Sequence, residues 1–423
     1  KGYKSMKRAR KAVLLLLSTI FSIAAVAQRH SILNENIRSL QVVANQDWLA
    51  LPIIEVGNGV LDINFDDLST EYHRYTYSLQ HCESNWKPSI SLFESDYVDG
   101  FANGNTIDDV TPSLLTNTAY THYHLRLPNS NCQPKLSGNY LLTIYDDNDN
   151  VAIKVCFMVK EPFTKSMGVG LNIVTNTDAT INNAHQQVEM ELKYNSYNVT
   201  NPQSQIKTVL LQNKRWDNAR WNVKPQYVMN DGLRWSHNAN YIFWAGNEYR
   251  KFEILSTNVA ATGIERILWD GKHYNAYPFI SLPRPNYLYD EDADGAFLIR
   301  NSDNNNINTE SDYVLVHFQL SSPQFTNGDV YVNGDWTYDR FLPQYKLIYD
   351  DQSKSYKAVI PLKLGYYSYQ YVLVDENGNA EIAPTEGNYY QTENSYQALV
   401  YYREQGGRTD KLVGYTAVKF KIK

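Results

Sequence analysis

Residues 121–127 read THYHLRL, and this stretch decides the fold class. Tyr123, Leu125 and Leu127 alternate with polar or charged side chains at a period of two. Successive side chains of a β-strand point to opposite faces, so this spacing predicts a strand with one buried face. The same alternation recurs at residues 75–79 (YTYSL), 313–320 (YVLVHFQL) and, with one slip, 140–145 (YLLTIY).

Turn signals separate the predicted strands. They are residues 146–150 (DDNDN), 326–328 (TNG) and 375–378 (DENG), whose Asn, Asp and Gly residues favour tight turns. The 34 tyrosines fit a pleated, half-buried surface, and helical spacing beyond residue 30 is weak. The pattern predicts an all-β chain built from tandem antiparallel β-sandwich domains of the immunoglobulin-like kind.

The first 27 residues have the pattern of a secretory signal peptide. Met6 precedes a basic stretch (KRARK), and the apolar residues 12–27 end in Ala25-Val26-Ala27. We expect cleavage between Ala27 and Gln28, export of the remainder, and residues 1–5 to be upstream translated sequence. The alternative is an uncleaved membrane anchor, but the apolar run is shorter than the ~20 residues that a bilayer span needs. No comparable run follows, so we expect no membrane span in the remainder.

The charge of the exported part disfavours a nucleic-acid partner. Residues 1–27 contain six Lys or Arg and no Asp or Glu, which leaves 33 basic and 45 acidic side chains, a formal net charge of −12. A nucleic-acid-binding domain needs a basic face to meet the phosphates.

Two stretches predict domain boundaries. Residues 156–162 (CFMVKEP) have the pattern of a last strand that ends in a linker, and the prolines of residues 278–285 (PFISLPRP) stop β-ladders and stiffen connections. After the leader at 1–27, we expect an N-terminal β-sandwich at 30–162, a middle aromatic-rich β-sandwich at 163–284 and a C-terminal β-sandwich at 285–423.

Residues 71–86 (EYHRYTYSLQHCESNW) combine residue types that catalysis and metal binding use. If this stretch is a strand, His73 and His81 share a face but lie ~27 Å apart, while Cys82 points to the opposite face. A Cys–His dyad needs hydrogen-bond contact, which neighbours in a strand do not provide. The pattern therefore favours packing over catalysis, with partners from other strands left open.

Two further groups could bind a metal. His122 and His124 share a strand face at ~7 Å, which needs a third ligand, and Tyr120 is a weak candidate. Asp290, Asp292 and Asp294 match the start of a calcium loop, but its twelfth position holds Asn301 where a Glu is needed. An ordinary acidic loop is favoured here, and a calcium site is left open.

Other residue types leave their own alternatives. Cys82, Cys132 and Cys156 are an odd number, so one disulfide among them or three buried thiols are both possible. Aromatic side chains crowd the middle segment and form either a core or a platform for sugars or a partner. They are Trp216, Trp221, Trp235, Phe243, Trp244, Tyr249, Phe252 and Trp269. Because GxSxG, HExxH, P-loop and GxGxxG motifs are lacking, we predict no catalytic residue, cofactor or metal.

Short stretches in a fixed order carry a family resemblance over nearly the whole exported part. They are residues 51–54 (LPII), 65–68 (FDDL), 77–82 (YSLQHC) with 85–86 (NW), 97–101 (YVDGF), 120–123 (YTHY), 134–142 (PKLSGNYLL), 246–253 (GNEYRKFE), 331–336 (YVNGDW) and 364–371 (LGYYSYQY). Together they resemble the plug protein family of the Bacteroidota type IX secretion system, formerly a domain of unknown function.

The resemblance implies a non-enzymatic protein of the periplasm, associated with the inner side of the outer membrane. It implies a plug that binds the periplasmic end of the outer-membrane translocon barrel and seals it when no substrate is present. The segments 333–336 and 365–369 also resemble early-set sandwiches found beside glycan-active enzymes, so the C-terminal domain is expected to be early-set-like. The alternative function is an exported carbohydrate-binding module protein with a glycan partner.

Overall fold

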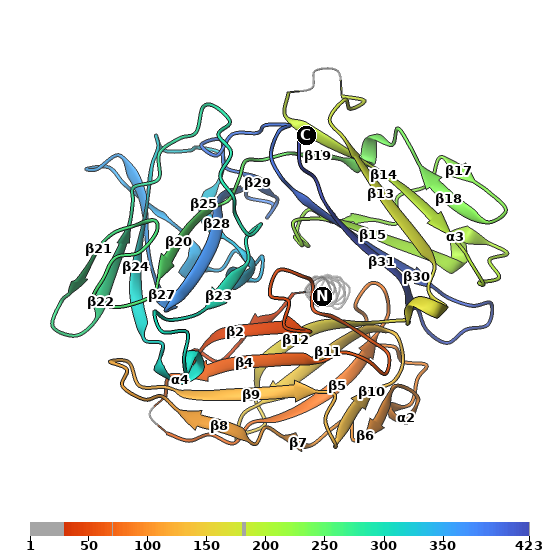
Figure 1. Ribbon diagram of the computed structural model, residues 1–423, viewed down its shortest axis with the longest axis horizontal. Coiled ribbons are helices and arrows are strands. Elements are labelled where there is room, and N and C mark those ends of the chain that lie inside the picture. Colours follow the sequence, from red (N-terminus) through yellow and green to blue (C-terminus); the bar gives the residue numbers. More distant parts are fainter. Residues whose placement is uncertain (1–28, 70, 180–182, 423) are drawn as a thin grey trace, which may run out of the picture.

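The computed structural model describes residues 29–69, 71–179 and 183–422. The predicted cleavage site at Ala27 and Gln28 lies outside these residues and stays a prediction. The described chain forms three lobes, each built around two packed β-sheets, and the first lobe has an additional two-stranded sheet (Figure 1). This confirms the predicted all-β class and its tandem β-sandwiches.

The first lobe comprises residues 29–165 and contains the stretch THYHLRL as β9. The sheet β2-β4-β9-β8 packs on β12, β11, β5 and β7, and the core between them includes Tyr123, Leu125 and Leu127, as the alternation predicts. Its elements are β1 (Ser31–Ile32), β2 (Ile37–Ala44), β3 (Ile53–Glu55), β4 (Leu61–Asp67), β5 (Thr76–Cys82), α2 (Glu94–Tyr97), β6 (Val98–Gly100), β7 (Asn105–Thr106), β8 (Asp109–Pro112), β9 (Thr121–Leu127), β10 (Cys132–Pro134), β11 (Gly138–Tyr145), β12 (Val151–Lys160) and the 3-10 turn η2 (Phe163–Lys165).

The second lobe combines residues 166–249 with residues 394–422 from the end of the chain. The sheet β13-β14-β18-β17 packs on β15, β30 and β31, and these last two strands are the blue ones beside the green second lobe in Figure 1. Its elements are β13 (Gly168–Val174), β14 (His185–Lys193), α3 (Pro202–Gln205), β15 (Ile206–Gln212), β16 (Arg220–Trp221), β17 (Tyr227–Val228), β18 (Gly232–Trp235), η3 (Ala239–Tyr241), β19 (Ile242–Trp244), β30 (Ser395–Tyr402) and β31 (Lys411–Lys419).

The third lobe comprises residues 250–393, and β28 pairs with β20, β23, β25 and β29 opposite the sheet β21-β22-β24-β27-β26. Its elements are β20 (Arg250–Ile254), β21 (Ile264–Trp269), β22 (Tyr274–Pro278), β23 (Phe297–Ile299), α4 (Ile307–Glu310), β24 (Tyr313–Ser321), β25 (Asp329–Asn333), η4 (Asp335–Thr337), η5 (Pro343–Tyr345), β26 (Ile348–Asp350), β27 (Ser355–Lys363), β28 (Gly365–Val374) and β29 (Ala380–Ile382).

The first and second lobes share one continuous sheet. Its order is β16-β15-β30-β31-β12-β11-β5-β7, and Lys160 of β12 pairs with Leu412 of β31 at the crossing. In β15 and β30 both faces are covered: Leu210 and Val400 enter the second-lobe core, while Leu211 and Leu399 enter a cluster shared with the first lobe. Strands covered on both faces read as continuous apolar runs, which is how residues 398–400 (ALV) read.

The last two strands, β30 and β31, return to the second lobe, and this affects how the chain divides into domains. Whether 30–162, 163–284 and 285–423 fold as units stays a prediction. We propose that the second unit is discontinuous, because its core draws residues both from 167–243 and from 396–413. The α-helices in the described part of the chain are four residues long and its 3-10 helices are shorter, so none of them could span a bilayer.

Candidate functional site

The two histidines of β9 have separate carboxylate partners. His122 Nδ1 lies 2.7 Å from Asp66 Oδ1. His124 lies between Asp62 and Asp109, 2.8 Å from each carboxylate. Over the described residues, no three His, Cys, Asp or Glu side chains are grouped as a metal site requires. The histidines therefore act as hydrogen-bonding partners within the first lobe.

The cluster at residues 71–86 is dispersed. Because β5 begins at Thr76, His73 lies before the strand, where its Nδ1 is 3.0 Å from Asp147. His81 Nε2 donates to the Ser137 carbonyl at 3.1 Å, and its Nδ1 lies 2.8 Å from Ser89 Oγ. A Ser–His contact of this kind can activate a nucleophile. Here His81 and Ser89 are only 1% and 7% exposed, so a substrate could not reach the hydroxyl.

The three cysteines are buried, and Cys156 lies in the apolar contact between the first and second lobes. Cys82 and Cys132 are free thiols, and burial raises the pKa of each to about 12. Cys156 Sγ lies 3.5 Å from the Arg29 carbonyl. Of the two alternatives that the sequence left open, the structure shows buried thiols.

The acidic loop at residues 290–295 uses its carboxylates for contacts within the protein. Asp290 pairs with Lys251 at 2.6 Å, and Asp292 accepts from the backbone N–H groups of Tyr249 and Asp294. Burial, and then the charge of Asp294, raises the pKa of Asp292 to about 8. Asn301 donates to a backbone carbonyl. In a calcium loop the oxygen ligands point toward one central ion, whereas here the carboxylates contact different groups of the protein.

Most of the aromatic side chains named from the sequence serve packing. Trp216 and Trp221 lie beside the apolar contact between the first and second lobes, and Trp235, Phe243, Tyr249 and Phe252 are buried. Trp244 of β19 and Trp269 of β21 are 54% and 48% exposed. They lie on different lobes, so they do not form one stacking platform. The glycan alternative stays a prediction.

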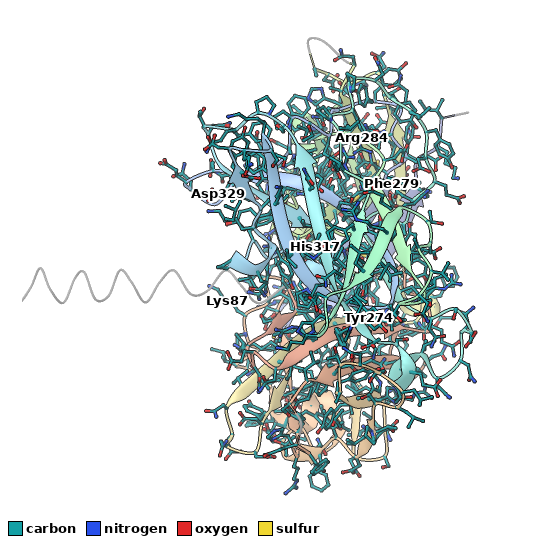
Figure 2. All side chains as sticks on the ribbon, turned by 90° about the vertical axis from the view of Figure 1, so that its left-hand side faces the viewer. Lys87, Tyr274, Phe279, Arg284, His317 and Asp329 are labelled. Atoms are coloured by element: carbon teal, nitrogen blue, oxygen red, sulfur yellow. The ribbon has the colours of Figure 1, made fainter. Side chains whose placement is uncertain are left out.

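The third lobe presents an outer sheet face with apolar side chains, on the side shown in Figure 2. The Tyr277 ring stacks on His317 with centroids 4.4 Å apart, and Arg266 lies 4.5 Å from the centre of the Tyr277 ring. Phe279 and Val359 are exposed on the same lobe. This face therefore includes both exposed apolar groups and a stacked cluster of Tyr277, His317 and Arg266.

A buried ion pair joins the first and third lobes. Lys363 of β27 lies 2.6 Å from Asp66 of β4, and the two are 2% and 1% exposed. Tyr313 donates to the same carboxylate at 2.6 Å, and Lys363 also lies 4.2 Å from the centre of the Tyr120 ring. Burial lowers the pKa of Lys363. Such a pair tolerates loss of one partner poorly, because the other charge is left buried and uncompensated.

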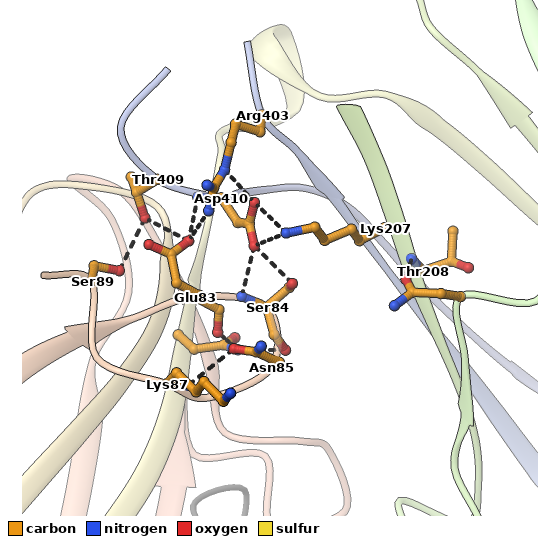
Figure 3. Close-up of polar contacts among 12 residues, drawn as sticks. Glu83, Ser84, Asn85, Lys87, Ser89, Lys207, Thr208, Arg403, Thr409 and Asp410 are labelled. Carbon is orange, nitrogen blue, oxygen red and sulfur yellow. Dashed lines mark hydrogen bonds and ion pairs between the residues drawn. The ribbon is translucent and has the colours of Figure 1, made fainter. Parts of the chain in front are cut away.

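An apolar cluster and an ionic network join the first and second lobes. Cys156 and Met158 of β12 pack against Val209, Leu211 and Leu399. At the edge of this cluster lies the ionic network, which Figure 3 shows.

In the network, Arg403 and Lys207 both lie 2.8 Å from Asp410, and Arg403 also pairs with Glu83. Although burial opposes ionisation, hydrogen bonds from Lys207 and Ser84 hold the pKa of Asp410 below its usual value. The positive charges of Arg403 and Lys207 balance the negative charges of the two carboxylates. The network therefore adds polar contacts at the edge of the apolar contact between the first and second lobes.

Comparison with known proteins identifies the family. Residues 37–161 match the model of the type 9 secretion system plug protein, first domain. The chain belongs to the type IX secretion system plug protein family. A crystal structure of a hypothetical protein from Parabacteroides merdae is 36% identical with a TM-score of 0.89, covering 93% of this chain and 100% of that one. No curated protein sequence matches the chain.

The match confirms the family resemblance predicted from the sequence and gives this plug-family chain a role in type IX secretion. The matched residues begin with β2 and end just after β12, so they cover the first lobe without β1. The Parabacteroides structure extends the similarity to the second and third lobes.

The sequence did not single out the charged residues at the lobe junctions of this plug-family chain. Asp66 and Lys363 are 297 positions apart, and Glu83 and Arg403 are 320 apart. The sequence gives one partial indication at Lys363. This lysine ends the mostly apolar stretch of residues 356–363 (YKAVIPLK), and a lysine is rarely found where a strand enters a core. No local pattern pairs it with Asp66.

Proposed function

We propose that this chain is a non-enzymatic plug that binds the periplasmic end of the type IX translocon barrel in the outer membrane and seals it when no substrate is present. The observation that carries the proposal is the family match over the first lobe. The predicted signal peptide supports export to the periplasm, where such a plug lies against the inner side of the outer membrane.

The architecture supports a sealing role on physical grounds. A compact chain of 423 residues has a radius of gyration of about 22 Å, whereas a 100-residue domain has about 13 Å. A body of this size covers an opening that passes a folded domain. Lobes joined by a shared sheet and buried charges keep one shape, as a seal requires.

Co-purification tests the binding step. An affinity-tagged chain, expressed in its host and extracted in gentle detergent, should enrich one very large outer-membrane β-barrel in mass spectrometry. A tagged exported protein of similar size and charge is the control. Recovery of the chain without the barrel in repeated preparations contradicts the proposal.

Permeability tests the sealing step separately. Deleting the gene should increase uptake of a large antibiotic that the outer membrane normally excludes, and deleting the barrel as well should abolish the increase. If uptake is unchanged while the barrel still co-purifies, the chain binds the translocon without sealing it.

A further inference from the structure

The first described residues, Arg29–Ile32, lie where the first and third lobes meet, and we call them the strap. Ser31–Ile32 form β1, which pairs with β12 of the first lobe. The two residues before β1 bond to the third lobe. Arg29 Nη1 donates to the Asp339 carbonyl at 2.5 Å, and Arg340 Nε donates to the His30 carbonyl at 2.6 Å.

The strap is also fixed to the first lobe through Cys156. The Cys156 N–H donates to His30 Nδ1 at 3.1 Å, and its Sγ lies 3.5 Å from the Arg29 carbonyl. Burial, and then the charge of Arg340, lowers the pKa of His30 to about 4. The ring is therefore neutral near pH 7 and keeps Nδ1 as an acceptor. Arg29 and His30 thus each contact both lobes.

The third-lobe segment under the strap has an unusual backbone. Tyr338 and Asp339 have φ values of 57° and 51°, in the left-handed region that few non-glycine residues adopt and that a bulky residue such as Tyr adopts less readily than Asp. The Tyr338 hydroxyl donates to the Leu40 carbonyl of the first lobe at 2.8 Å. The Asp339 carboxylate accepts from the Trp216 N–H of the second lobe at 3.2 Å. All three lobes therefore meet at this segment.

We propose that the strap is a conformational lock that holds the third lobe against the first. When Arg29 and His30 are removed or displaced, residues 338–340 relax and the third lobe moves away from the first. The biological role of the lock rests on the proposed plug function. If the chain seals the barrel, movement of its third lobe would break the seal. Cleavage after Ala27 keeps the strap, whereas loss of three more residues removes its bonds to the third lobe.

Hydrogen exchange of the purified protein tests the lock. A chain that starts at Gln28 is compared with one that starts at Ser31 and with the double substitution Arg29→Ala, His30→Ala. Amide exchange in residues 336–341 should rise about tenfold or more in both changed chains, while residues 396–400 of β30 keep their protection. The control is Glu35→Ala, an exposed position just beyond β1. The double substitution keeps the test valid if the truncated chain folds poorly.

A distance measurement gives the second readout. Spin labels at Lys87→Cys and Asp329→Cys, two exposed positions on the first and third lobes (Figure 2), should report a longer and broader distance without the strap. The native cysteines are buried and will not compete for the label. Unchanged exchange and unchanged distance overturn the lock. Because both readouts use the isolated chain, this result is distinguishable from failure of the co-purification test.

Discussion

Where the first lobe meets the second, apolar side chains of β12, β15 and β30 pack in one buried cluster. Where it meets the third, a lysine–carboxylate pair, tyrosine hydroxyls and the strap fill the contact. The two junctions differ in how they respond to change. Apolar contact is non-directional and grows with area, whereas a buried ion pair depends on both partners.

This difference divides the molecule into a fused part and an attached part. The first and second lobes share a sheet and a core, so separating them exposes apolar area over several strands. The third lobe adds Tyr338 to the first-lobe core and places the Tyr313 ring against Tyr120, and its attachment also depends on the buried pair of Lys363 and Asp66. A single substitution can therefore weaken its attachment, and it is the lobe most suited to move.

The largest expected effect comes from Lys363→Ala. The change leaves Asp66 charged and buried without its cation, which should cost about 3–5 kcal/mol of stability. Urea unfolding followed by tyrosine and tryptophan fluorescence measures it. A control on the same strand is Lys357→Ala, because Lys357 is exposed and pairs with the surface residue Asp350, a contact worth about 0–1 kcal/mol.

A second substitution separates charge from packing. In the Lys363→Ala background, Asp66→Asn should restore part of the lost stability, since no unpaired charge then remains. If the double variant is as unstable as the single one, the junction depends on the packing of the lysine stem, and the comparison between the junctions weakens.

The apolar junction is tested by Leu211→Ala, with an expected cost of about 3 kcal/mol from lost burial and the cavity left behind. Its neighbour Leu210 is equally buried but faces the second-lobe core, so Leu210→Ala is a matched comparison. Hydrogen exchange should show lost protection of β3 and β12 only for Leu211→Ala. Equal exchange patterns in the two variants contradict a separate apolar junction.

The sequence predicted those parts of the fold that depend on local pattern. THYHLRL has one buried and one polar face, so its period of two identifies β9 and its inward residues. Residues 395–402 are covered on both faces, so their pattern carries no period. Their return to the second lobe depends on pairing with β15, almost 200 positions earlier, which alternation cannot show.

The junction residues were beyond sequence reasoning for the same reason. His122 was noted as a metal candidate because of His124, but its partner is Asp66, whose other oxygen meets Lys363. The residue type of His122 predicted that it takes part in polar contacts. That these contacts join the first and third lobes could be seen only once the structure placed Lys363 beside Asp66.

The last expected effect concerns pH and Asp292, which accepts the Tyr249 N–H between the second and third lobes. Its pKa is raised from 3.8 to about 8, mainly by burial. The folded chain therefore keeps a proton that the unfolded chain releases, so this group makes stability fall as pH rises from about 4 to about 8. Asp292→Asn should remove this slope, so its stability relative to the parent should be higher at pH 8 than at pH 5. The comparison is made between pH values, because the amide nitrogen of Asn cannot accept one of the two backbone N–H groups that Asp292 accepts.

Thermal unfolding at pH 5, 6.5 and 8 measures the slope. Asp290→Asn is the control, because this carboxylate two residues away is largely exposed. A parent protein whose stability rises with pH over this range, together with an unchanged slope in Asp292→Asn, would show that Asp292 is ionised in the folded state. The contact between the second and third lobes would then resemble the Asp66–Lys363 junction, where a charge is held by partners, and the third lobe would be attached by ionised groups on both sides.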